Sequence, residues 1–305
     1  LPVLMELAER LATTEGVAAV IGPIPNTPTD PTAADAVIIQ LKPTTGPQEA
    51  ATADLVHSLR NDVVPSVTDG TDVVVNVSGA VAANIDFSTY LAERIPIFFV
   101  SVLSLSFLLL MMVFRSILVP LKAALLNLLS IGAAYGVVVA VFQWGWGRSL
   151  IGLDEAVPIA SFVPMMMFAI LFGLSMDYEV FILSRIREEY NKGHTNIDSV
   201  VEGLGATAKV ITAAALIMIS VFIGFVTSGD PVVKMMGVGL ATAVALDATI
   251  VRMVLVPSTM TLVGDANWWL PRWLDRLLPH IDMEGEQDVE DEAEPVSDPA
   301  EIGTA

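Results

Sequence analysis

The sequence of 305 residues contains no cysteine. It can therefore form neither a disulfide framework nor a metal site built from thiolates. Histidine is almost as scarce, because only His57, His194 and His280 occur, and they lie too far apart in the sequence to form a recognisable ligand motif. We expect no cofactor and no bound metal.

Charged residues are also few, at 16% of the chain, whereas hydrophobic residues make up 54% and the mean hydropathy is +0.67. This composition is typical of a membrane protein. The net charge of −19 comes mainly from two segments: residues 1–94 hold 12 acidic and 4 basic residues, and residues 281–305 hold 10 acidic and no basic residues. Such an excess of negative charge argues against nucleic acid as a partner.

Residues 1–94 predict a small water-facing domain. The expected elements are a helix (1–14), two strands (17–21 and 36–41), a helix (48–61) and a strand (73–77). A ferredoxin-like split unit has the order β-α-β-β-α-β, so this order is that unit without its first strand. Because the chain also starts at Leu1 without a signal peptide pattern, we expect further sequence before it. The alternative is a complete small α/β domain of unusual order.

Five apolar segments are each long enough to cross a bilayer. They cover about residues 95–114, 122–146, 157–184, 210–229 and 232–256. Residues 95–264 are therefore expected to form a transmembrane domain with five spans.

Basic residues in the connecting segments predict the orientation in the cell membrane. One side holds Arg115, Lys122, Arg185, Arg187, Lys192 and Lys209, and the other holds Arg94, Arg148 and Lys234. The more basic side is expected in the cytoplasm. Residues 1–94 then lie outside the cell, and the C-terminal tail lies inside.

Two further segments follow the last span. Residues 265–280 include NWWLPRWLDRLL, which predicts a short amphipathic helix on the inner membrane surface. Residues 281–305 are too acidic and too poor in apolar residues to fold alone, so we expect a disordered acidic cytoplasmic tail.

The third span is interrupted by Asp177, Tyr178 and Glu179, after which apolar sequence resumes at 180–183. A carboxylate within hydrocarbon is costly, so such residues face a bundle interior or a wet cavity, and a proton or ion relay is the first hypothesis. The alternative is that Asp177 begins a cytoplasmic loop. Residues 180–183 would then be unused apolar surface.

Helix geometry separates the roles of these three residues. Asp177 precedes Arg185 by about 12 Å along an α-helix, and Gly173 on the same face would let a neighbouring helix approach. The Tyr178 hydroxyl, about 100° round the helix, can reach a carboxylate on another helix but not readily Asp177. Glu179 points about 200° from Asp177 and is expected to support the relay or to snorkel to the interface.

The fifth span contains Asp247 and Arg252. Their separation corresponds to about 140° on an α-helix, which makes them poor partners for each other. Arg252 is expected either to snorkel to the inner interface or to support the relay. Asp247 is expected in a structural hydrogen bond or in the relay itself. Gly237 and Gly239 suit close helix packing.

Four stretches of the chain resemble one family. They are GLSMDYEVFILSRIREEY (173–190), FRSILVPLKAALLNLLSIGAAYG (114–136), LDATIVRMVLVPSTM (246–260) and NWWLPRWLDRLLP (267–279). They resemble the MMPL family (mycobacterial membrane protein large), a branch of the RND superfamily. The resemblance extends over nearly all of residues 95–279, whereas residues 1–94 match only in architecture.

The resemblance implies a fold of twelve spans in two pseudo-repeats, each with an extracytoplasmic porter domain after its first helix. On this basis the chain is the C-terminal portion of such a protein. Its expected fold is an α-helical polytopic membrane protein, with five transmembrane helices of an RND-type bundle and a partial α+β ferredoxin-like porter domain.

The resemblance also implies a function. Members are proton-driven exporters of lipids, glycolipids or other hydrophobic compounds, not enzymes, and their coupling ion is the proton. Asp177 and Tyr178 match one Asp-Tyr pair of the family's relay, and the partner pair is expected in an N-terminal half. Expected partners are a hydrophobic substrate, the bilayer and that N-terminal half, with a homo-oligomer left open. The alternatives are a protein-translocation motor of the same superfamily and a non-transporting truncated scaffold.

Overall fold

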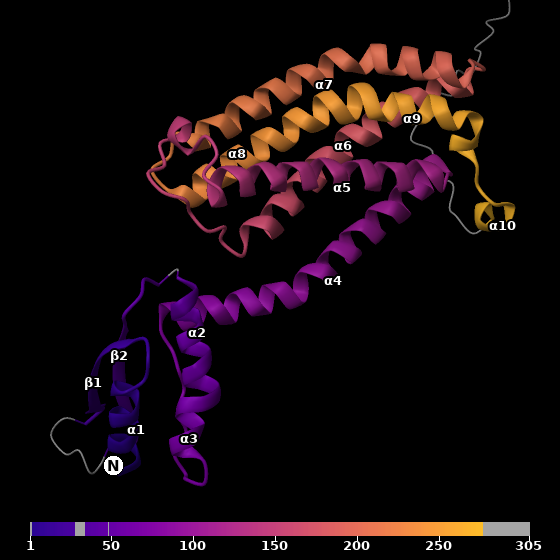
Figure 1. Ribbon diagram of the computed structural model, residues 1–305. Coiled ribbons are helices and arrows are strands. Elements are labelled where there is room, and N and C mark those ends of the chain that lie inside the picture. The colour runs from indigo at the N-terminus through magenta and orange to yellow at the C-terminus, as the bar shows by residue number, and fades with distance from the viewer. Residues whose placement is uncertain (1, 28–33, 48, 277–305) are drawn as a thin grey trace, which may run out of the picture.

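The computed structural model describes residues 2–27, 34–47 and 49–276. A small domain of helices and strands comes first, and a bundle of long helices follows (Figure 1). Helix α4 (Ala80–Phe114) starts beside the small domain and runs without interruption into the bundle (Figure 1). The expected acidic tail, residues 281–305, lies outside the described residues.

Short elements build the small domain. They are α1 (Pro2–Ala12), β1 (Val17–Pro25), β2 (Val37–Pro43), α2 (Ala50–Ser58), the π-helical turn η2 (Leu59–Val63) and α3 (Val64–Thr68). Strands β1 and β2 pair antiparallel. Buried leucines of α1, α2 and η2 form the core, which includes Leu7, Leu55 and Leu59.

The segment after α3 differs from the prediction. Val75 and Val77 pack against the core of the small domain, but residues 73–78 are extended chain without a strand partner. A strand requires ladder hydrogen bonds to a neighbour. Packing of Val75 and Val77 against the core accounts for the alternating apolar residues without a strand. The prediction of a strand at residues 73–77 is therefore wrong. The described sheet has two strands, and the ferredoxin-like unit is not confirmed.

Five helices of the described chain are long and apolar enough to cross a membrane, as expected. After α4 they are α5 (Leu118–Val138) with η3 (Val139–Gln143), α6 (Val163–Asn191), α7 (Asn196–Val226), and α8 (Pro231–Leu246) continued by η5 (Asp247–Leu255), α9 (Val256–Val263) and η6 (Gly264–Trp268). A short 3-10 turn, η4 (Arg148–Ile151), precedes α6. The chain is therefore that of a multi-pass membrane protein.

Helix α4 connects the two parts of the molecule. Arg60 of the small domain donates hydrogen bonds from Nη2 to Asp86 Oδ2 (2.9 Å) and to the Val77 carbonyl (3.0 Å). Pro96 lies within α4 and removes one backbone hydrogen bond, which favours a bend at that point. Beyond it, Phe99 stacks on Phe168 of α6 with ring centroids 3.8 Å apart.

The expected surface helix after the last span is broken in the structure. Residues 269–271 are not helical, and α10 (Arg272–Asp275) is only four residues long. Pro271 explains the break, because it lacks an N–H and disfavours helical geometry in the residue before it. Arg115 anchors α10 to the end of α4 by donating from Nε to Asp275 Oδ1 at 3.0 Å.

Glycines set the spacing of α8 in the bundle. A Cβ at Gly237 would lie 2.8 Å from the Phe222 carbonyl oxygen and 3.0 Å from the Val226 nitrogen, both in the backbone of α7. At Gly239 a Cβ would collide with the Met167 side chain of α6. The prediction of close packing at these two glycines is confirmed. At Gly173 no described atom lies within 4 Å of such a Cβ.

We expect Gly237→Ala to destabilise the bundle, because the α7 backbone cannot move aside as a flexible side chain could. Overpacking of this kind costs about 1–3 kcal/mol. Thermal unfolding of the full chain in detergent measures the effect. Gly224→Ala on α7 is the matched control, since a Cβ there meets open space. Equal unfolding temperatures for the two variants would contradict this account of the packing.

Candidate functional site

The middle of α6 presents its three polar side chains in different directions. Asp177 is exposed on the outside of the described bundle, Tyr178 is half-buried, and Glu179 is only 5% exposed. Each helical residue is rotated by about 100° from the last, so neighbours in sequence meet different surroundings. The prediction that Glu179 snorkels is wrong. Asp177 lies on the open side of the helix instead of facing the interior of the described bundle.

A buried ion pair lies beside this segment of α6. Arg252, which is 0% exposed, donates from Nε to Asp247 Oδ2 at 2.8 Å. The Ser175 hydroxyl of α6 donates to Asp247 Oδ1 at 3.1 Å, and Arg252 Nη2 donates to the Ser175 hydroxyl oxygen (3.0 Å) and to its carbonyl. Two charges and one hydroxyl thus join η5 to α6 within the apolar bundle.

The pairing of Asp247 with Arg252 corrects the prediction made from α-helical geometry. Both residues lie in η5, which is π-helical, and the Val256 N–H closes it on the Val251 carbonyl, five residues back. In such a segment residues five apart lie about one turn apart on the same face. Arg252 therefore turns inward to Asp247 and does not snorkel. An interrupted α-helix of this kind is often found at functional sites.

The aromatic ring of Tyr178 contacts the guanidinium of Arg252 in this ion pair. The Arg252 guanidinium carbon lies 5.2 Å from the centre of the Tyr178 ring, a cation–π distance. The Tyr178 hydroxyl points to the Met218 sulfur of α7 at 3.6 Å. Among the described residues, the hydroxyl has no carboxylate partner.

A small cavity with mostly apolar walls and a few polar groups borders the ion pair. Its lining includes Asn127, Ser130, Ser175, Tyr178, Asp247 and Arg252. Both polar atoms of the buried Asn127 side chain, and Nη1 of Arg252, lack a hydrogen-bond partner among the described residues. Buried polar groups without a protein partner are the groups that bound water usually satisfies.

A second, smaller cavity contains Glu179. Lys122 of α5 and Thr259 of α9 line it together with Glu179. Within the described parts of the chain, the Glu179 carboxylate makes no hydrogen bond and no ion pair. Lys122 reaches toward the basic end of the bundle, where it donates a hydrogen bond to the Asn267 side chain.

Asn267 is a structural residue that the sequence analysis did not identify. It is 0% exposed, and its amide donates to the carbonyls of Met260 (2.7 Å) and Gly264 (2.6 Å). The Ser116 hydroxyl donates to the Asn267 carbonyl, so this residue ties η6 to the start of α5. An asparagine that directly precedes two tryptophans in an apolar stretch was the available signal.

The arrangement combines a fixed charge pair with a free carboxyl group. Asp247 and Arg252 neutralise each other in a closed network that holds η5 and α6 together. Asp177, on the same helix as Ser175 and Tyr178, has no hydrogen bond or ion pair within the described residues. Protonation of Asp177 can therefore change the charge of α6 without breaking the Asp247–Arg252 ion pair.

We expect Arg252→Met to be strongly destabilising, because it leaves Asp247 buried without a counter-charge. Removing one partner of a buried pair costs about 3–5 kcal/mol. The double variant Asp247→Leu/Arg252→Met, which removes both charges, is expected to recover much of that loss. Thermal unfolding in detergent compares the two. A double variant no more stable than Arg252→Met would contradict the pairing.

Comparison with known proteins places the chain among membrane transport proteins. It is 44% identical to the membrane protein YdfJ of Bacillus subtilis over 250 residues, which are 82% of this chain and 34% of YdfJ. It is 41% identical to the mycolic acid-containing lipids exporter MmpL11 of Mycolicibacterium smegmatis over 250 residues, 82% of this chain and 26% of that protein. It is 43% identical to the heme uptake protein MmpL11 of Mycobacterium tuberculosis (strain H37Rv) over 238 residues, 78% and 24% of the two chains.

The chain spans about a third or less of the length of these relatives. The sequence pattern of the MMPL family matches residues 5–279. This range includes nearly all of the small domain, the five apolar helices and the ion-pair site. The chain belongs to the MMPL family.

Proposed function

We propose that this chain is the C-terminal portion of a proton-motive-force-driven membrane exporter of lipids or other hydrophobic compounds. The observation that carries the proposal is the position of Asp177, a carboxyl group midway along the apolar helix α6 that has no hydrogen bond or ion pair among the described residues. It lies between Ser175 and Tyr178, which both contact the buried Asp247–Arg252 pair. In this proposal Asp177 binds and releases the coupling proton.

The exposure of Asp177 supports a partner outside this chain. A carboxylate on the lipid-facing side of a span is costly and is rarely found there. Gly173, one turn away on the same open side, leaves room for close approach by another helix. The proposed partner is the N-terminal half of the transporter, whose own Asp-Tyr pair would complete the relay.

Tyr178 and the ion pair have a supporting role in this proposal. Protonation of Asp177 removes the cost of keeping its charge in the membrane, which shifts the balance between two packings of α6. Because Ser175 and Tyr178 attach α6 to Arg252, a shift of α6 is passed to η5. Asp247 holds this contact through its bonds to Ser175 and Arg252, and Glu179 lies buried on the bundle side of α6.

The proposed orientation follows the basic residues. Arg115, Lys122 and Lys192 lie at the end of the bundle that holds α10, which would face the cytoplasm. The small domain would then lie outside the cell, as the resemblance implies for a porter domain. One relative is named as an exporter of mycolic acid-containing lipids, which supports export of hydrophobic compounds, whereas another is named as a heme uptake protein.

The alternative function in protein translocation predicts a different phenotype. A translocation motor would show secretion defects on deletion, with normal surface lipids. A non-transporting scaffold would show neither defect. These outcomes separate the three functions in one deletion strain.

We expect Asp177→Asn, introduced into the chromosomal gene of the host, to reduce lipid export to the level of the deletion strain. The amide keeps the size of the side chain but cannot take up a proton. The measurement is the amount of newly made radiolabelled lipid that solvent extracts from the cell surface. Immunoblotting of the membrane fraction checks that the variant inserts.

Asp154→Asn is the matched control, because this residue is exposed in the connection before α6 and outside the apolar segment. It is expected to export normally. Tyr178→Phe keeps the ring beside Arg252 and loses only the hydroxyl, so an export defect in this variant would assign a role to the hydroxyl. Normal export by Asp177→Asn would refute the relay.

A further inference from the structure

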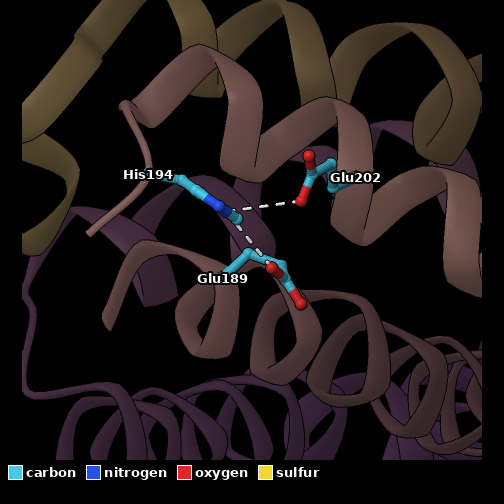
Figure 2. Close-up of side chains that lie close together, drawn as sticks. All are labelled: Glu189, His194 and Glu202. Atoms are coloured by element: carbon cyan, nitrogen blue, oxygen red, sulfur yellow. Dashed lines mark ion pairs between the residues drawn. The ribbon is translucent and has the colours of Figure 1, made fainter. Parts of the chain in front are cut away.

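The turn between α6 and α7 brings together three potential metal ligands that lie apart in the sequence. Glu189 belongs to the last turns of α6, His194 to the connection, and Glu202 to the second turn of α7. One ligand atom from each lies within 4.8 Å of the other two. Figure 2 shows both carboxylates on the same side of the His194 imidazole, with a dashed line from the ring to each.

The distances within this cluster suit coordination. His194 Nδ1 lies 3.2 Å from Glu189 Oε2 and 3.3 Å from Glu202 Oε2. Ligand atoms that each lie about 2.0–2.2 Å from a zinc ion in tetrahedral geometry are separated by about 3.3–3.5 Å. The two nitrogen–oxygen distances therefore need almost no change to admit an ion.

The backbone that carries the cluster is held in place by packing. A Cβ at Gly203 would lie 2.9 Å from the backbone nitrogen of Ile186, so α6 and α7 touch directly at this point. Glu202 precedes Gly203, and Glu189 follows Ile186 by one turn. Thr195 caps α7 by accepting a hydrogen bond from the Asp198 N–H at 3.2 Å, which fixes the residue next to His194.

A neighbouring lysine occupies only part of the acidic surface. Lys192 Nζ contacts Glu189 Oε1 at 2.8 Å and Glu188 Oε1 at 2.8 Å. Glu189 Oε2, the oxygen that faces His194, is a different atom. Lys192 thus orients the Glu189 carboxylate from one side and leaves its other oxygen directed at the imidazole.

We infer that Glu189, His194 and Glu202 form a binding site for a divalent transition-metal ion of the zinc type. One imidazole nitrogen and two carboxylate oxygens supply three protein ligands, and water fills the remaining position because His194 and Glu202 are exposed. An imidazole ligand favours zinc and similar ions over magnesium and calcium, which prefer oxygen ligands alone.

The site would act as a clamp between two spans. With the ion bound, the C-terminal end of α6 is fastened to the start of α7 at the basic end of the bundle. Asp177 lies midway along the same helix α6. The inference is independent of the proposed transport, because it concerns binding at a surface turn remote from the ion pair.

The test is isothermal titration of zinc chloride into the full chain, purified in detergent without a histidine tag and treated with EDTA. We expect one zinc ion per chain. Substitution of a ligand is expected to weaken binding at least about tenfold, so His194→Ala and Glu202→Gln should both do so. Magnesium chloride in excess should not compete.

Two control variants keep the test specific. His57→Ala removes an exposed histidine of the small domain, and Glu188→Gln removes a carboxylate next to the proposed ligands that does not contact His194. Both should bind zinc as the unchanged chain does. Zinc should also raise the unfolding temperature of the unchanged chain but not of His194→Ala, since an ion that binds only the folded state stabilises it.

The inference would be overturned if the unchanged chain bound no zinc, or if His194→Ala bound it with unchanged affinity. A loss of binding in His57→Ala equal to that in His194→Ala would also overturn it. His194 is exposed in a turn, so its variants are expected to fold, and size-exclusion chromatography in detergent verifies this.

Discussion

The absence of water within a bilayer is the constraint on which the rest of this structure depends. Backbone polar groups there need partners from the protein itself, and a charged side chain is costly. Nε and Nη2 of Arg252 find partners in Asp247 and Ser175, and the guanidinium lies over the ring of Tyr178. These partners come from two different helices. The ion pair therefore fixes how η5 and α6 lie against each other, and it can do so only because η5 departs from α-helical geometry.

The same constraint makes the surroundings of the two carboxylates of α6, Asp177 and Glu179, important. Glu179 faces a small cavity shared with Lys122, whereas Asp177 faces away from all described helices. The two carboxylates of one helix therefore lie in different surroundings, Glu179 buried in the bundle and Asp177 exposed.

The two ends of the bundle are closed by different means. At the basic end, Asn267 and Arg115 tie the last helical turns to α4 and α5 through hydrogen bonds. At the other end, Lys234 of α8 donates to the carbonyls of Ile151 (2.6 Å) and Gly152 (3.1 Å) and so holds the connection before α6. Between these ends, glycine contacts and aromatic stacking hold the helices together, with few hydrogen bonds.

The sequence alone determined the membrane class, the five spans and the residues of the α6 motif, because apolar length and the cost of charge in hydrocarbon act locally along a chain. Only the tertiary structure decided which polar residues meet. The π-helical segment paired Asp247 with Arg252 against the expected helical angle, the direction of each α6 side chain separated Asp177 from Glu179, and the α6–α7 turn gathered His194 with two glutamates. Such contacts depend on backbone irregularities and on packing between segments that are distant in the sequence. Neither can be predicted from the spacing of hydrophobic residues along the chain.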